Sequence, residues 1–172
     1  MTIINRELTP TSNGSYQQLS HNASSAWEAI KYNDGYHIYC TSYTAWQTST
    51  FHLLANLIPQ GSIIDHVVMQ SRFWTGASGR CTSYNATYFG GQLRTHSSIY
   101  QPQYYDNVVT DTFYNSPDGT PWLREDLDNI QFGASMKRYD SGGYTAYWDW
   151  LRVTVYYTPP TGGKVRFIGV ML

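Results

Sequence analysis

Apolar and polar residues alternate along several short segments of this chain. The clearest case is the segment 62–74, where Ile63, Val67, Met69 and Phe73 share one parity and mostly polar residues hold the other. Alternation with a period of two is typical of a strand that buries one face. Similar short segments predict about eight to ten strands in all. The others are 16–19, 26–32, 36–42, 48–54, 80–89, 92–97, 107–114, 130–135 and 146–157.

Glycine-rich turns separate several of these segments. The sequences Asn33-Asp34-Gly35 and Gly90-Gly91 are strong signals for tight β-hairpins. A third such turn, Asp140 to Gly143, predicts a last hairpin between 130–135 and 146–157.

One helix is predicted, at about 121–130. Thr120 fits its N-cap, and Pro121 fits the first helical position, where its missing N–H has no partner to lose. Leu123, Leu127 and Ile130 then fall on one apolar face.

Many short strands and a single helix predict an all-β fold, a jelly-roll β-sandwich with extended terminal arms. We expect one domain over 1–157, with an N-terminal arm at 1–15, where turn residues replace any periodicity. A C-terminal extension, 158–172, follows and is largely apolar after Gly163. Two interpretations of this extension stay open: a last strand of the chain's own sandwich, or an arm that contacts a neighbour.

Composition excludes some partners. The 172 residues carry a net charge of -1 without a basic stripe, which argues against nucleic-acid binding. No apolar run is long enough for a membrane span, and no signal peptide is recognisable. With cytoplasmic synthesis, Cys40 and Cys81 are expected to be reduced and buried.

The chain is rich in tyrosine (16) and tryptophan (6), against 11 basic and 12 acidic residues. Such a composition suits protein interfaces, and it equally suits a large β core. Two groups of aromatic and apolar residues are candidates for contact surfaces. The candidate interface residues are Tyr100, Tyr104, Tyr105, Val165, Phe167 and Ile168. The candidate residues for stacking against sugar rings are Tyr43, Trp46, Tyr144 and Trp148.

Reaction chemistry is not predicted. The five histidines are dispersed without metal-ligand spacing, and the acids Glu125, Asp126 and Asp128 suit a solvated helix face. Folding could pair two of Asp111, Asp140 and Asp149 as in a glycoside hydrolase, but their spacing singles out no pair. We therefore expect no catalytic, cofactor-binding or metal-binding residues and no enzymatic activity.

Two stretches of the chain resemble a family of bacteriophage minor virion proteins. The first runs from Pro10-Thr11-Ser12-Asn13-Gly14-Ser15-Tyr16 to Trp27-Glu28-Ala29-Ile30. The second comprises Gly119-Thr120-Pro121-Trp122, Ile130-Gln131-Phe132-Gly133 and Val153-Thr154-Val155-Tyr156-Tyr157. The resemblance implies a virion component that is made in the bacterial cytoplasm.

On this resemblance we expect a homo-oligomeric capsid decoration (cement) protein that binds the major capsid protein. The alternative is a tail or fibre module that recognises a host surface glycan through its loop aromatics.

Overall fold

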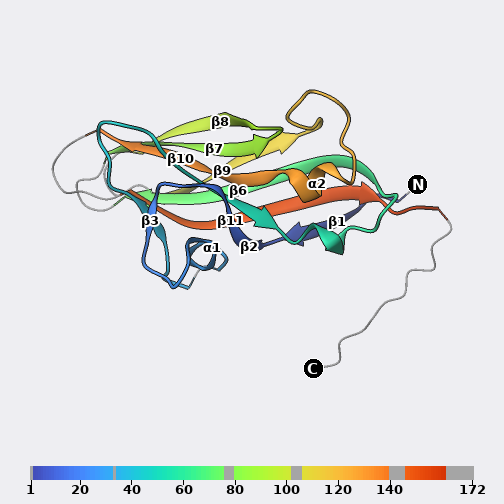
Figure 1. Cartoon of the computed structure of the whole chain (residues 1–172), viewed down its shortest axis with the longest axis horizontal. Coiled ribbons are helices and arrows are strands. Elements are labelled where there is room, and N and C mark those ends of the chain that lie inside the picture. The colour runs from blue at the N-terminus through green and yellow to red at the C-terminus, as the bar shows by residue number, and fades with distance from the viewer. Residues whose placement is uncertain (1, 33, 76–79, 102–105, 140–145, 162–172) are drawn as a thin grey trace.

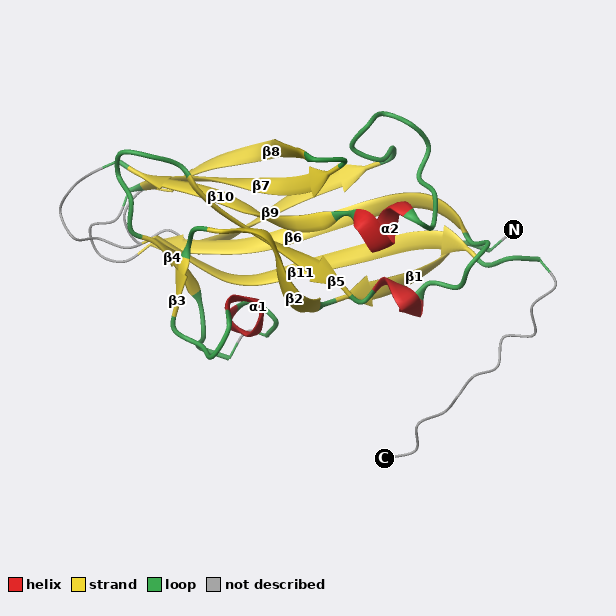
Figure 2. Ribbon diagram, in the orientation of Figure 1, coloured by secondary structure: helices red, strands yellow, loops and turns green. Residues whose placement is uncertain are grey.

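The computed structural model describes residues 2–32, 34–75, 80–101, 106–139 and 146–161, in which two antiparallel sheets pack face to face (Figures 1 and 2). The six-stranded sheet contains β1 (Ile4–Leu8), β3 (Ser20–His21), β4 (Ile38–Cys40), β6 (Ile63–Thr75), β9 (Asp106–Phe113) and β11 (Ala146–Thr158). The five-stranded sheet contains β2 (Pro10–Gln17), β5 (Gln47–Leu53), β7 (Cys81–Phe89), β8 (Gln92–Gln101) and β10 (Gln131–Arg138).

The strand order is that of a jelly roll. The order β4-β11-β6-β9 in one sheet faces β5-β10-β7-β8 in the other. Among these eight strands, successive strands cross between the sheets except at β7–β8. The predicted all-β jelly-roll sandwich is confirmed. The Gly90-Gly91 hairpin is confirmed too, because Phe89 pairs with Gln92 and both glycines have positive φ (57° and 79°).

Three large rings hold the sheets together. Trp148 on β11 is completely buried, and its ring centroid lies 5.6 Å from that of Phe51 on β5 and 6.1 Å from that of Phe73 on β6. Phe132, Met69 and Met136 fill the space around them. The core therefore lies between the sheets.

The predicted hairpin between 130–135 and 146–157 was wrong. β10 pairs with β5 and β7, whereas β11 pairs with β1, β4 and β6, so the two strands lie in different sheets. The turn-type sequence between the two strands predicts that the chain reverses direction. It does not predict whether the second strand pairs with the first, as in a hairpin, or joins the other sheet.

The predicted helix is much shorter than expected. Only α2 (Asp126–Asn129) is helical. Pro121 bridges to Asn115 in an extended conformation, and the buried Trp122 donates its indole N–H to the Phe113 carbonyl at 2.9 Å. This anchor keeps the chain extended past Pro121, and Leu123 is left 61% exposed instead of joining Leu127 and Ile130 in the core.

The segment 26–32 is not a strand, and the residues after Met1 do not form a free arm. Residues 26–29 form α1 (Ala26–Ala29), and the buried Ile30 accepts a hydrogen bond from the Leu151 N–H at 3.0 Å, between the stretches where β11 pairs with β4 and β1. The expected arm at 1–15 was wrong because β1 pairs with β11 and β2 with β5. In the C-terminal extension, 162–172 lie outside the described residues.

Cys40 and Cys81 are free and buried, as predicted. Burial raises the pKa of the Cys40 thiol, and it raises the pKa of Cys81 to about 12. Because the thiolate is the reactive form, both side chains behave as small core residues.

Candidate functional site

The site that fits a ligand best is a pocket on the outer face of the five-stranded sheet. Its volume is about 300 Å³, and Trp46, Thr48, Tyr84, Leu93, Thr95 and Ser135 line it. Trp46 is 41% exposed, and its ring centroid lies 4.9 Å from that of Tyr84 with the ring planes tilted by 58°. None of the six lining residues carries a charged side chain. We call it the Trp46 pocket.

Four strands supply the pocket because their outward positions coincide. Tyr84 on β7 pairs with Ser135 on β10, and Ser135 pairs with Thr48 on β5. Opposite residues of antiparallel strands point to the same face, so these three side chains form one row. The Thr48 and Ser135 hydroxyls lie 2.6 Å apart on the pocket floor, and Leu93 and Thr95 on β8 complete the wall.

The loop that carries Trp46 is held firmly in place. The Gln47 side-chain oxygen accepts the N–H groups of Thr41 and Ser42 at 2.9 and 3.0 Å. The Ser42 hydroxyl accepts the Ala45 N–H at 3.1 Å, and the Ser42 carbonyl accepts the Arg138 N–H at 3.1 Å. Trp46 is therefore presented by a pre-organised loop, which lowers the entropic cost of binding.

Residues 14–16 of β2 pass over the same outer face. The Ser15 and Tyr16 N–H groups donate to the side-chain oxygens of Gln131 (2.7 Å) and Thr50 (3.2 Å), and the Tyr16 ring lies edge-on to Tyr88 at 5.5 Å. Tyr88 shares the outward parity of Tyr84 on β7, four residues away, which is about 13 Å along a strand. A second aromatic pair therefore lies along the same face as the Trp46 pocket.

A second aromatic cluster lies on the six-stranded sheet. Trp74 and Tyr147 are stacked at 3.9 Å, and His37 contacts Tyr147 edge-on at 4.6 Å. These rings are half-buried and pack mainly against one another. We therefore interpret this cluster as packing between β4, β6 and β11.

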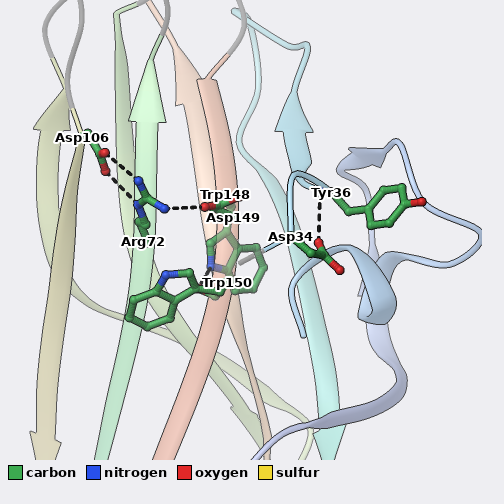
Figure 3. A network of polar contacts seen from close by, with 7 residues as sticks. All are labelled: Asp34, Tyr36, Arg72, Asp106, Trp148, Asp149 and Trp150. Atoms are coloured by element: carbon green, nitrogen blue, oxygen red, sulfur yellow. Dashed lines mark hydrogen bonds and ion pairs between the residues drawn. The ribbon is translucent and has the colours of Figure 1, made fainter. Parts of the chain in front are cut away.

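Beside these rings, Arg72 connects three strands (Figure 3). Its guanidinium binds both oxygens of Asp106 on β9, at 2.9 and 2.7 Å, and donates to Asp149 on β11 at 2.8 Å. Arg72 lowers the pKa of Asp106, whereas burial raises the pKa of Asp149. Both carboxylates face the guanidinium, and the Asp149 side chain is only 8% exposed. This geometry fits ion pairs that hold the three strands together better than an acid/base pair that acts on a ligand.

A hollow larger than the Trp46 pocket, about 490 Å³, lies beside α1. Its lining residues are Asn22, Ala23, Ser24, Trp27, Glu28, Lys31, Tyr32, Asp34 and Tyr36. Two of its three aromatic rings already contact a cation of the chain, because the Lys31 ammonium lies 5.3 Å from the Trp27 centroid and 5.1 Å from that of Tyr32. The chain's own cation thus occupies the surface that a ligand would need.

The predicted stacking residues have different positions. Trp46 lines the pocket that bears its name, and Tyr43, 52% exposed, lies on the same loop without lining it. The prediction for Trp148 was wrong, because its ring is enclosed between Phe51 and Phe73. Tyr144 lies outside the described residues.

The structure provides little information on the predicted interface residues. Tyr100 belongs to β8, and the other five, Tyr104, Tyr105, Val165, Phe167 and Ile168, lie outside the described residues. Within the described ranges, no three His, Cys, Asp or Glu side chains gather as a metal site would require. In the same ranges, no helix is long and apolar enough to cross a membrane.

No protein-family model and no curated protein matches the chain. Among solved structures, it is similar to the CBM22-1 xylan-binding domain of Xyn10C from Paenibacillus barcinonensis (8% identity, 86% of this chain and 85% of that chain, TM-score 0.43). The C-terminal CBM6 of LamC from Zobellia galactanivorans is similar to the same degree (12% identity, 88% and 99%, TM-score 0.43). The Eiger TNF from S. frugiperda is also similar (6% identity, 95% of this chain and 98% of that chain, TM-score 0.39).

With identities of 6 to 12% and TM-scores below 0.5, these likenesses carry no argument about function. None of them bears on the resemblance to phage virion proteins, which stays a prediction. Function has to be argued from the residues of the chain itself.

Proposed function

We propose that this chain is a non-enzymatic binding module for an uncharged glycan, which it holds in the Trp46 pocket. One observation carries the proposal: a tryptophan that is 41% exposed stands on a hydrogen-bonded loop above a floor of hydroxyl groups. An exposed aromatic side chain leaves a large apolar surface in water. A ligand with both apolar and polar groups can cover such a ring and at the same time form hydrogen bonds with the polar groups beside it.

The chemistry of a sugar ring fits each part of the pocket. One face of a pyranose presents C–H groups, which pack on the rings of Trp46 and Tyr84. Its hydroxyl groups can donate to and accept from Thr48, Thr95 and Ser135, since each hydroxyl has one donor and two acceptor positions. The volume of about 300 Å³ lies at the lower end of small-molecule sites, which suits a short part of a glycan.

The absence of charge among the lining residues argues for a neutral ligand and against hydrolysis. An anionic sugar would leave its carboxylate or sulfate without a cationic partner in the pocket, at a large desolvation cost. Glycoside hydrolysis needs two carboxyl groups on either side of the bond. The six residues that line the Trp46 pocket supply neither a cation nor a carboxyl group.

Replacing Trp46 with alanine is expected to weaken glycan binding about thirtyfold or more, because truncating an aromatic hot spot costs roughly 2 kcal/mol or more. Affinity electrophoresis against soluble neutral polysaccharides (a xylan, a mixed-linkage glucan, a galactomannan) measures the effect, and titration calorimetry with the polysaccharide that retards the protein quantifies it. Tyr43→Ala, an exposed aromatic of the same loop, is the matched control and should bind like the original chain.

The proposal fails if no neutral polysaccharide retards the protein, or if Trp46→Ala and Tyr43→Ala bind equally well. Stronger retardation by anionic polysaccharides such as alginate or heparin would contradict the uncharged ligand.

Capsid decoration remains a second proposal. It rests on the resemblance of the stretches 10–30 and 119–157 to phage minor virion proteins. The chain would then be recovered in purified virions at a fixed ratio to the major capsid protein. A receptor-binding role would instead place it in the tail.

A further inference from the structure

Exposed aliphatic side chains concentrate at one end of the sandwich. Among the described residues, the exposed large aliphatic side chains other than Val108 belong to the start of β1, the loop 54–62, the first residue of β6 and the turn before α2. These segments lie toward the end of the sandwich that holds the N-terminus and the last residues of β11 (Figures 1 and 2). We call this surface the aliphatic end; its residues are Ile3, Ile4, Leu54, Leu57, Ile63 and Leu123.

Contacts around the loop 54–62 bring these residues together. The Leu54 N–H donates to the Thr9 carbonyl at 3.4 Å, just after β1. The buried Arg124, next to Leu123, donates to the carbonyls of Ala55 and Ile58 at 2.7 Å each. Ile63 follows this loop directly as the first residue of β6. An apolar surface of this kind normally has a partner.

The C-terminal segment starts at this surface. Thr158, the last residue of β11, pairs with Ile63, and Pro160 lies close enough to Gly61 to be 3.6 Å from a Cβ placed there. The eleven residues 162–172 lie outside the described structure, and six of the last eight are large and apolar: Val165, Phe167, Ile168, Val170, Met171 and Leu172. Fully extended, eleven residues reach about 36 Å, enough to cross the aliphatic end.

We propose that residues 164–172 dock on the aliphatic end of their own chain. Only Gly162 and Gly163 separate this segment from Thr161, the last described residue, so its effective concentration at the surface is of millimolar order. The same segment of a second copy, at micromolar concentration, therefore competes poorly for this surface with the segment that is covalently attached.

Opposite charges on the segment 164–172 and on the surface next to Leu123 support the same docking. The segment carries Lys164 and Arg166, whereas the turn and helix at 124–128 carry three carboxylates, Glu125, Asp126 and Asp128, against the one guanidinium of Arg124. Arg124 pairs with Asp128 at 2.9 Å, so the region keeps an acidic excess beside Leu123.

Hydrogen exchange read by mass spectrometry tests this docking in the full chain, in the 1–161 truncation and in Phe167→Asp. We expect the amides of 54–63 and 123–127 to exchange about tenfold faster in both variants, and Tm to fall by roughly 3–6 °C. Val108→Asp, an exposed aliphatic on β9 far from this end, is the matched control and should exchange like the original chain. Light scattering should report a monomer for all four proteins.

Equal exchange at 54–63 and 123–127 in the full chain and in Phe167→Asp would overturn the proposal, whether or not the truncation folds. An oligomer that becomes monomeric on truncation would also overturn it, because the segment would then bind a neighbour. Polysaccharide retardation should be the same in every variant, so this test is independent of the Trp46 pocket.

Discussion

Trp148→Ala is expected to lower the free energy of unfolding by about 4 kcal/mol. The Trp148 side chain is completely buried, and its ring contacts Phe51 of the facing sheet and Phe73 of the neighbouring strand. Its indole N–H donates to the Trp150 carbonyl at 3.0 Å, so truncation also removes this hydrogen bond (Figure 3). The cavity would open between the two sheets, where neither sheet can move inward without disturbing the other.

Urea unfolding followed by circular dichroism measures this effect. Trp46→Ala removes the same ring from an exposed position and should cost less than about 1 kcal/mol. If Trp148→Ala kept its stability and lost glycan binding instead, Trp148 would be a surface residue, as the sequence alone suggested.

The error at Trp148 shows where alternation misleads. Apolar side chains at Leu151, Val153 and Val155 share one parity, so the pattern places Trp148 on the opposite, outer face. The pairing of β11 with β6 shifts between Trp148 and Trp150, a bulge that adds one residue on β11. One extra residue reverses the face of every side chain beyond it, so Trp148 and Leu151 both point inward. The added residue is Asp149, and no glycine marks this bulge in the sequence.

The fold class could be predicted from the sequence more completely than the candidate site. Alternation over 62–74 and 107–114, and turn residues near the ends of 48–54 and 80–89, located β5, β6, β7 and β9 to within a residue or two. Trp46 could be selected as a loop aromatic. Tyr84, Thr95 and Ser135 could not be joined to it, since only the pairing of β5, β10, β7 and β8 brings them to one face. Long-range strand pairing is the information that a single sequence lacks.

Gly133→Ala should be the second severe change, with a loss of about 3 kcal/mol or more, or failure to fold. Gly133 lies on β10 opposite Thr50 of β5. A Cβ added there would overlap the Ser49 carbonyl oxygen and lie 2.7 Å from the Thr50 Cα. These are backbone atoms of a paired strand, so no side-chain rotation can relieve the overlap.

Two opposing effects decide whether Gly133→Ala stabilises or destabilises the fold. Alanine is ordinarily favoured over glycine inside a strand by roughly 0.5–1 kcal/mol, because glycine loses more backbone entropy on folding. Separating β5 from β10 costs more than this gain, since it weakens ladder hydrogen bonds next to Phe51 and Phe132, which pair one residue away. The overlap therefore dominates.

Urea unfolding beside Gly90→Ala distinguishes backbone overlap from the ordinary cost of replacing a glycine. Gly90 has a φ of 57° and nothing within 4 Å of an added Cβ, so its replacement should cost only about 1 kcal/mol. Equal losses at the two sites would mean that β5 and β10 separate easily. Thr48 and Ser135, two residues along from Thr50 and Gly133, form the floor of the Trp46 pocket. A Gly133→Ala protein that still folds should therefore also bind glycan more weakly, because the same displacement changes the spacing of these hydroxyls.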